Sequence, residues 1–417
     1  MHSNISAAPT SNRIDLLDIL RGLAIFGILM VNMQIFYRPM TVMLAGYTGA
    51  ESFVNIGSQA IIKFFFEGKF YVLFSFLFGY GFWMFINKRT AGGGSIIPVF
   101  RRRMLILLMI GILHVVLLWP GDILVFYALF GFLLILFRRK SDTTLLKWSA
   151  FFLLLPIVFT VFTVLIPELA SVHPESKEMY EASIKEEKQF LFSFIDKAYE
   201  IYGRGSFSEI VSLRLQEYFI MLPGIFFFYP MVLAMFIAGV WGGRKRIIED
   251  YRSNLPFFRK SLWVGLVGGI LSNVIYTWSH FTAELVVPDI WTFISSTFHI
   301  VGGVLLCLFY VSAIVLLYDK GKISIIGRYL APVGRMALTN YLLHSLICTT
   351  LFLPYGFGLF GEINVFQGVL LTIVIFAAQV LLSNVWLRYF RYGPFEWVWR
   401  SLTYMKRQPI KIRNAGS

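Results

Sequence analysis

Residues 101–140 read RRRMLILLMIGILHVVLLWPGDILVFYALFGFLLILFRRK. Basic triplets stand at both ends of this stretch, and the only other charged or imidazole side chains in it are His114 and Asp122. Pro120-Gly121 divides the apolar run into two halves, each slightly shorter than the roughly 20 residues that a helix needs to cross a membrane. A Pro-Gly turn between basic ends predicts a helical hairpin whose turn lies across the membrane from the triplets.

The composition of the whole chain also indicates a membrane protein. Its 417 residues are 57% hydrophobic and 14% charged, whereas about a quarter of the residues in soluble domains are charged. So little polar sequence cannot cover a soluble fold of this length, which excludes that class. We predict an all-α polytopic membrane helical bundle of about ten transmembrane helices, near residues 17–37, 61–86, 104–119, 121–137, 145–167, 218–241, 261–281, 290–318, 331–353 and 364–388.

Lys and Arg residues are unevenly distributed along the chain. A net charge of +14 in a soluble protein would suggest a nucleic-acid partner. Here the basic residues gather in alternate connections, at 87–103, 138–147, 242–260, 319–335 and 388–417. Because cytoplasmic connections are enriched in Lys and Arg, we expect both termini in the cytoplasm. The positive net charge is then explained by the orientation of the chain in the membrane, and we expect no nucleic-acid partner.

This map divides the chain into four parts. We expect an N-terminal membrane bundle (1–167), an extracytoplasmic amphipathic insert (168–217), a C-terminal membrane bundle (218–390) and a basic cytoplasmic tail (391–417). Within the insert, the apolar residues recur at helical spacing among many charged ones, which is typical of an amphipathic helix.

Polar side chains at membrane depth are costly and usually face a bundle interior, so they are the first candidates for function. Asp18 and Arg21 lie three residues apart at the start of the first span and share a helix face. Their spacing is equally consistent with an anchoring ion pair. Glu67 and Lys69 lie at the outer boundary of the second span, where we favour the lining of a pocket over snorkelling.

Three histidines, His114, His299 and His344, fall near the midplane when about 1.5 Å is counted per helical residue. A single buried histidine is more often a hydrogen-bonded core residue than a catalytic one. His114 is better placed, because Asp122 follows it across the Pro-Gly bend and a carboxylate orients an imidazole and raises its basicity. Two regular helices would hold these side chains apart, so contact requires a water or an unwound turn.

The absence of several motifs narrows the class of function. The sequence has no HExxH, CxxC or Walker pattern, so a metal site, a redox pair and a nucleotide hydrolase have no support. A transporter remains open, because discontinuous helices around polar residues at the midplane describe many transporters.

Several stretches resemble the YeiB-like family of bacterial membrane proteins. They are LDILRGLAIFGILMVN (17–32), GKF (68–70) with LFSFLFG (73–79), GILH (111–114) with GDIL (121–124), GRMALTNYLL (334–343) and GPFEWVWRSLTY (393–404). This resemblance covers nearly the whole chain and implies location in a bacterial cytoplasmic membrane.

The YeiB-like family is distantly similar to transmembrane acyltransferases, including heparan-α-glucosaminide N-acetyltransferases and acyltransferase-3 proteins. The resemblance implies acyl-CoA as co-substrate, with its phosphates near Arg21 and Arg335 and a proton or acyl group accepted by His114. The heparan enzymes use a histidine between their first two spans, and residues 37–69 contain none. Many YeiB-like proteins are expected to have glutamine at the position of His344, which argues against an obligatory catalytic role for it.

We therefore expect an integral membrane acyltransferase that acts on an extracytoplasmic sugar, envelope polymer or lipid. The expected catalytic residues are His114, Asp122, Glu67 and Lys69, and the expected substrate or cofactor contacts are Asp18, Arg21, Asn32, Arg335, Asn340, His344 and His299. A transporter or exporter of a small amphiphile is the competing class, and a structural membrane protein is the third. A homodimer is the default expectation for the assembly.

Overall fold

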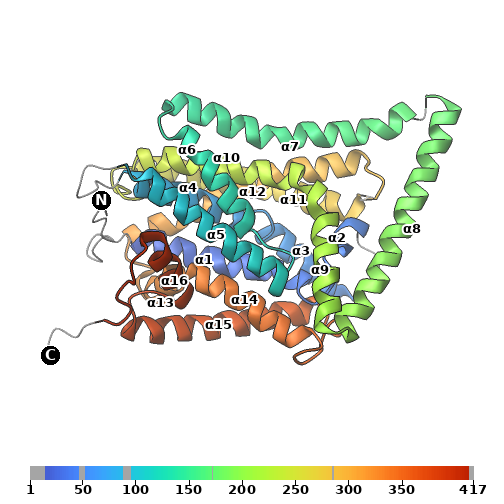
Figure 1. Cartoon of the computed structure of the whole chain (residues 1–417). Helices are drawn as coiled ribbons and strands as arrows, with labels where there is room; N and C mark the ends of the chain where they lie inside the picture. Colours follow the sequence, from blue (N-terminus) through green and yellow to red (C-terminus); the bar gives the residue numbers. More distant parts are fainter. Residues whose placement is uncertain (1–14, 47–51, 88–94, 171, 284–285, 413–417) are drawn as a thin grey trace.

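The computed structural model in Figure 1 describes residues 15–46, 52–87, 95–170, 172–283 and 286–412. Throughout these residues the regular structure is helical, with one isolated β-bridge between Phe390 and Lys411. The predicted all-α fold is confirmed. The terminal residues 1–14 and 413–417, which the sequence predicts to be cytoplasmic, lie outside the described residues.

The helices follow one another as α1 (Asp15–Asn32), η2 (Met33–Ile35), α2 (Val42–Ala45), α3 (Phe53–Phe65), α4 (Phe70–Ile86), α5 (Ile97–Leu117), α6 (Leu124–Phe137), α7 (Asp142–Ala170), α8 (Pro174–Arg204), α9 (Phe207–Met221), η3 (Leu222–Gly224), α10 (Ile225–Arg244), α11 (Leu255–Thr282), α12 (Ile290–Asp319), α13 (Ser324–Arg335), α14 (Ala337–Phe352), α15 (Val365–Tyr389) and α16 (Pro394–Tyr404). Most of the long helices run side by side along one direction (Figure 1). α8 crosses one end of this bundle, and α13 and α16 lie at the other end, which we call the basic end because α5 begins and α15 finishes there with arginines.

Five helices in the described part of the chain are long and apolar enough to cross a membrane. They are Asp15–Ile35, Asp142–Leu169, α11, α12 and α15. α9 and α10 form a sixth candidate that is bent by 70°. Only 17% of the most apolar window of α7 is buried in the protein, which is typical of a helix that faces lipid. The chain is a helical membrane protein.

The predicted span 61–86 requires correction, because it is two helices rather than one. α3 ends at Phe65, residues 66–69 form turns, and α4 begins at Phe70. Gly68 has a φ of +88°, a left-handed conformation that glycine adopts readily and that an α-helix does not contain. The predicted span 331–353 is likewise interrupted, at Met336 between α13 and α14.

α4 and α10 cross at two glycines in the centre of the bundle. A Cβ atom on Gly79 would lie 1.9 Å from the carbonyl oxygen of Phe236, and one on Gly239 would lie 2.1 Å from that of Phe76. No other residue permits backbones this close. Small residues at helix crossings favour association in lipid through van der Waals packing, and this crossing adjoins the largest hydrophobic core.

The insert is helical and is joined to the bundle by buried polar contacts. The segment in which an amphipathic helix is predicted forms α8. Glu217 on the following helix, α9, accepts hydrogen bonds from the Tyr202 hydroxyl at 2.8 Å and from the Thr41 backbone at 2.9 Å. Arg214 donates to the carbonyl oxygen of Val116 at the end of α5. These contacts fix the end of the bundle opposite the basic end.

Candidate functional site

Three buried side chains, two of them near each other in sequence and one far away, meet between α5, α6 and α14. His114 Nε2 lies 2.7 Å from Ser345 Oγ, in a hydrogen bond. His114 Nδ1 lies 2.8 Å from Asp122 Oδ2, in a close ion-pair contact whose alignment is not that of a hydrogen bond. Each of the three residues is at most 3% exposed. We call these residues the His114 cluster.

The chain between α5 and α6 explains why His114 and Asp122 meet. Residues 118–123 are not helical, as the Pro120-Gly121 pair predicts. Asp122 Oδ1 accepts a hydrogen bond from the backbone nitrogen of Val125 in the first turn of α6, at 2.8 Å. The other oxygen of the same carboxylate reaches back to the imidazole. The unwound turn that the sequence required is therefore present, and the contact is direct.

A glycine holds α5 and α6 close together beside this contact. A Cβ atom on Gly111 would lie 2.7 Å from the backbone nitrogen of Val125, which is closer than real Cβ contacts allow. Gly111 lies one turn before His114 on α5. Packing at this glycine therefore sets the distance between the imidazole and the carboxylate.

Tyr341 lies one turn before Ser345 on α14 and faces the same imidazole. The centres of the Tyr341 and His114 rings are 5.3 Å apart. The Tyr341 hydroxyl accepts a hydrogen bond from the backbone nitrogen of Ile123 at 3.3 Å. Because that bond uses the oxygen as an acceptor, the hydroxyl proton remains to be donated to a bound group.

The arrangement of hydroxyl, imidazole and carboxylate is that of a nucleophile, a base and an orienting acid. In a set of this kind, a ring proton on Nδ1 beside the carboxylate leaves Nε2 to accept the proton of a hydroxyl that attacks a carbonyl carbon. Burial in an apolar environment strengthens each of these electrostatic contacts relative to water. Acyl transfer is the chemistry that this set of groups can perform.

Ser345 is the member of the cluster that the sequence analysis missed. The neighbouring His344 was the predicted contact, but consecutive residues of a helix point in different directions, and it is Ser345 that faces His114. A signal was present, because Ser345 follows Tyr341 by four residues and so shares its helix face. The partner of that face, α5, lies more than 200 residues earlier in the chain, and spacing cannot reveal such a contact.

A second polar cluster surrounds the break between α3 and α4. Lys63 Nζ lies 3.0 Å from Glu67 Oε2, and the Tyr276 hydroxyl donates to Glu67 Oε1 at 2.9 Å. Lys69 is fully buried, and its ammonium donates to the carbonyl oxygen of Lys63 at 2.7 Å. The same ammonium lies 5.4 Å from the centre of the Tyr276 ring.

His299 completes this second group. Its Nε2 atom lies 3.3 Å from the Tyr71 hydroxyl, and its ring covers Gly68, where a Cβ atom would lie 3.0 Å from the imidazole. We call Lys63, Glu67, Lys69, Tyr71, Tyr276 and His299 the Glu67 cluster. The sequence groups Glu67 and Lys69 with His114 and Asp122 as expected catalytic residues. In the structure they belong to two separate clusters: Glu67 and Lys69 bond to residues of α3 and α11, whereas His114 and Asp122 contact each other and α14.

His344 and Asn340 point toward α15 and away from His114. His344 Nε2 lies 2.8 Å from Gln379 Oε1, and Gln379 Nε2 donates to the carbonyl oxygen of Asn340 at 3.0 Å. The Asn340 amide in turn donates to Ser383 Oγ at 3.0 Å. This chain of buried bonds joins α14 to α15 and fixes the helix that carries Ser345.

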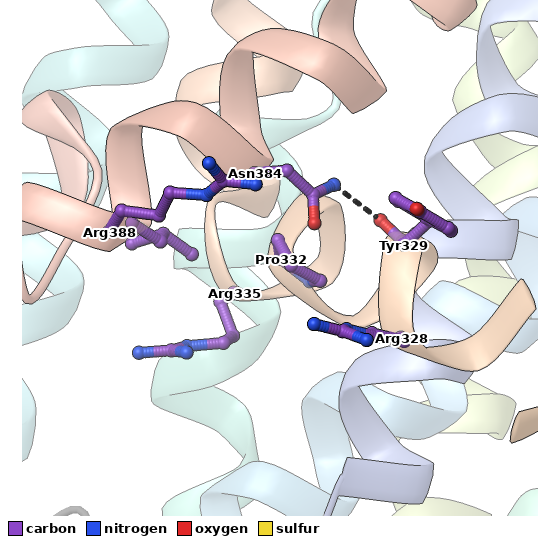
Figure 2. Close-up of a pocket in the computed structure, with 7 residues that line it drawn as sticks. Arg328, Tyr329, Pro332, Arg335, Asn384 and Arg388 are labelled. Carbon is purple, nitrogen blue, oxygen red and sulfur yellow. Dashed lines mark hydrogen bonds between the residues drawn. The ribbon is translucent and has the colours of Figure 1, made fainter. Parts of the chain in front are cut away.

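The remaining predicted contacts lie toward the ends of α1 and α13. Arg21 pairs with the buried Asp18 at 2.9 Å. Asn32 is half-buried at the end of α1. Arg335 lines a cavity of about 290 Å³ between α13 and α15, together with Arg328 and other residues (Figure 2). Asp18 and Arg21 do not line this cavity.

α16 is attached to the start of α14 by a carboxylate outside the candidate spans. Glu396 accepts hydrogen bonds from the backbone nitrogen of Thr339 at 3.0 Å and from its hydroxyl. Burial raises the pKa of Glu396 above its usual range, and the two bonds from Thr339 act in the opposite direction. The Glu396 side chain therefore connects the signature segments 334–343 and 393–404.

Comparison with known proteins gives similarity along the full length. The chain is 35% identical to the uncharacterized protein YxaH of Bacillus subtilis, over 98% of each chain. It is 31% identical to the uncharacterized protein YeiB of Escherichia coli, over 93% of this chain and 95% of YeiB. Residues 242–406 match the model of a family described as a protein of unknown function, DUF418. α14, with Ser345, lies inside the matched region, and His114 and Asp122 precede it.

Proposed function

The chain belongs to the family of YxaH and YeiB, and we propose that it is an integral membrane acyltransferase that uses the His114 cluster. The observation that carries this proposal is the contact of one imidazole with a serine hydroxyl at 2.7 Å and with a carboxylate at 2.8 Å. The proposed donor is a cytosolic acyl-CoA, and the proposed acceptor is an extracytoplasmic sugar, envelope polymer or lipid.

In the first half of the proposed reaction, Ser345 Oγ attacks the carbonyl carbon of the thioester while His114 Nε2 takes the hydroxyl proton. The carbon–sulfur bond breaks, and the thiolate leaves with the proton from His114. In the second half, His114 removes a proton from the acceptor hydroxyl or amine, which attacks the acyl-serine. The ester bond to Ser345 breaks, and the serine oxygen recovers its proton.

Asp122 and Tyr341 have supporting roles in this scheme. The Asp122 carboxylate stabilises the imidazolium that forms in each half-reaction. The Tyr341 hydroxyl is placed to donate to the oxygen that becomes negative at the acyl carbon.

Acyl-enzyme trapping tests the proposal directly. We expect purified protein incubated with a panel of acyl-CoAs to release free CoA and to gain the mass of one acyl group on Ser345. Ser345→Ala and His114→Ala should abolish both signals while the thermal midpoint stays within a few degrees of the parent. Ser312→Ala, which changes a buried serine on α12 outside both clusters, is the matched control. An acyl group retained in Ser345→Ala would remove this residue from the mechanism.

A transporter of a small amphiphile is the second candidate function, and the Glu67 cluster favours it. A broken helix with buried charge at the break is typical of substrate sites in secondary transporters. This function predicts flux across proteoliposomes without any acyl-CoA, and Glu67→Gln should reduce that flux while Ser345→Ala leaves it unchanged.

We further propose that the basic end faces the cytoplasm and that about ten spans cross the membrane. The support is the concentration of Lys and Arg at that end. A cysteine placed at Lys322 should react with an impermeant maleimide only from the cytoplasmic side, and one at Glu175 only from outside. The native Cys307 and Cys348 are buried and give a low background. Labelling of both positions from one side would contradict this topology.

A further inference from the structure

The cavity between α13 and α15 is lined by three arginines. Arg328 and Arg335 come from α13, and Arg388 comes from α15, with Tyr329, Pro332, Asn384 and Leu387 completing the lining. Figure 2 shows the three arginine side chains around the same space. No acidic residue is among those that line it.

Helix periodicity explains why these side chains converge. Arg328, Pro332 and Arg335 are four and three residues apart on α13 and therefore share one face. Asn384, Leu387 and Arg388 have the corresponding spacing on α15. The sequence thus presents one stripe from each helix to the same cavity.

Asn384 holds the two walls of the cavity together. Its amide nitrogen donates to the carbonyl oxygen of Tyr329 at 3.0 Å, across the two helices, and to that of Val380 at 2.8 Å within α15. Figure 2 shows the bond to Tyr329 beside the arginines. Both N–H donors of the amide are used in these two bonds, so Asn384 has a structural role in joining the helices. The positive charge of the cavity comes from the arginines.

The cavity volume of about 290 Å³ is several times the share of about 30 Å³ that one molecule has in liquid water. It therefore has room for a group larger than a water. Three guanidinium groups around one space attract an anion to it. Guanidinium groups present paired N–H donors that match the oxygens of phosphate.

We propose that this cavity binds a phosphate group at the basic end of the bundle. The inference rests on the arginines and on the cavity, and it stands independently of the acyl-transfer chemistry. Two sources offer the group: a phosphorylated nucleotide from solution and the headgroup of an anionic phospholipid. The same two helices carry exposed apolar side chains, among them Ile326 and Val385. Lipid chains can contact these side chains, which places a lipid headgroup within reach of the cavity.

Thermal unfolding of the full-length protein in neutral detergent tests the site with four probes. Inorganic pyrophosphate and adenosine 3′,5′-bisphosphate represent the soluble source, dioctanoyl phosphatidylglycerol represents the lipid source, and dioctanoylglycerol is the lipid without phosphate. A ligand that binds only the folded protein raises its thermal midpoint. We expect a rise with at least one phosphate probe, a smaller rise at high salt, and none with dioctanoylglycerol.

Arginine variants assign that rise to the cavity. The double variant R328Q/R388Q changes two exposed side chains and should lose at least half of the shift, whereas R259Q, an exposed arginine near the start of α11, should retain it. If the double variant does not purify as a folded protein, the two single variants carry the test, each with a partial loss. An equal shift in parent and variants, or no shift with any phosphate probe, would overturn the site.

The same experiment separates this inference from the proposed function. Ser345→Ala should keep the full phosphate-dependent shift, because Ser345 lies on α14 and does not line the cavity. Loss of acylation with retained stabilisation would leave the phosphate site standing alone. The lipid and nucleotide arms then identify which source supplies the group.

Discussion

The His114 cluster and the Glu67 cluster contain similar side chains, but they differ in how their groups are connected. In the His114 cluster one imidazole contacts a hydroxyl on one side and a carboxylate on the other. In the Glu67 cluster a single carboxylate contacts one ammonium and one phenol, and a second ammonium is buried beside them. The first cluster places an imidazole between a hydroxyl and a carboxylate, whereas the second is a set of opposed fixed charges.

This difference shows that the number of buried charges is a poor guide to chemistry. The Glu67 cluster has more charged groups, yet its contacts explain how a broken helix is held together. The His114 cluster has few, yet each member has a separate role in the acyl transfer that we propose. Substitutions in the His114 cluster should therefore affect turnover most, and substitutions in the Glu67 cluster should affect stability most.

The largest effect is expected from Ser345→Ala. Removal of the hydroxyl leaves His114 with no proton to accept, so turnover of acyl-CoA should fall by about 1,000-fold or more. Release of CoA, followed with a thiol reagent, is the measurement. Ser345→Cys is the informative companion, because a thiol at this position keeps a nucleophile and should still become acylated. Turnover that survives Ser345→Ala would place the chemistry elsewhere.

Asp122→Asn should reduce turnover by about 100-fold or more, because the amide cannot stabilise an imidazolium as a carboxylate does. The asparagine oxygen can still accept the hydrogen bond from Val125 in the first turn of α6, so the fold is preserved. Steady-state kinetics should show the loss in kcat with little change in KM. A change confined to KM would indicate that Asp122 contacts the substrate instead.

Gly111→Ala tests the geometry without touching a polar group. The added methyl must push α6 away from α5 and so lengthen the distance from His114 to Asp122. A displacement of about 1 Å can cost about 100-fold in rate, and we expect a loss between about 10-fold and 100-fold. Gly203→Ala is the control, because a Cβ atom there has open space around it. Equal rates for the two variants would show that this spacing is unimportant.

Glu67→Gln should have the smallest effect on acyl transfer and a measurable effect on stability. Without the carboxylate, Lys63 and Lys69 are left with no counter-charge, which should cost about 1–3 kcal/mol because the pair is only partly exposed. The thermal midpoint should fall by several degrees. Tyr276→Phe, which removes one hydrogen bond and keeps the charge, should cost about 1 kcal/mol. Acyl transfer abolished by Glu67→Gln at unchanged stability would break the distinction between the clusters.

Much of the architecture follows from composition and periodicity. The long apolar helices were predictable because lipid requires continuous apolar runs, and the ends of α11, α12 and α15 lie within a few residues of the prediction except at the start of α11. The break at Gly68 was not predictable, since glycine occurs within helices as well as at their ends. His299, on the distant helix α12, packs against this glycine, and sequence spacing does not reveal that contact.

The sequence predicted the part of the candidate site whose residues are close together in the chain, and it missed the part that is far away. His114 and Asp122 are eight residues apart, and the Pro-Gly pair between them signals the bend that joins them. Ser345 is 231 residues from His114 in sequence, and only the packing of α14 against α5 brings it there. The arginine cavity was likewise only partly predictable. The spacing of residues within α13 and within α15 shows which side chains share a helix face, but it does not show that the two faces meet.

The separation of Ser345 from His114 also orders events during synthesis. The sequence of the α5–α6 hairpin is complete once residue 137 has been synthesised, so the imidazole and its carboxylate are available to pair early. The serine arrives only after nine further helices, α7 to α14 with the short η3 among them, have been made. A nascent or truncated chain that ends before α14 therefore carries a base without a nucleophile, and the proposed chemistry begins only when the C-terminal half has docked.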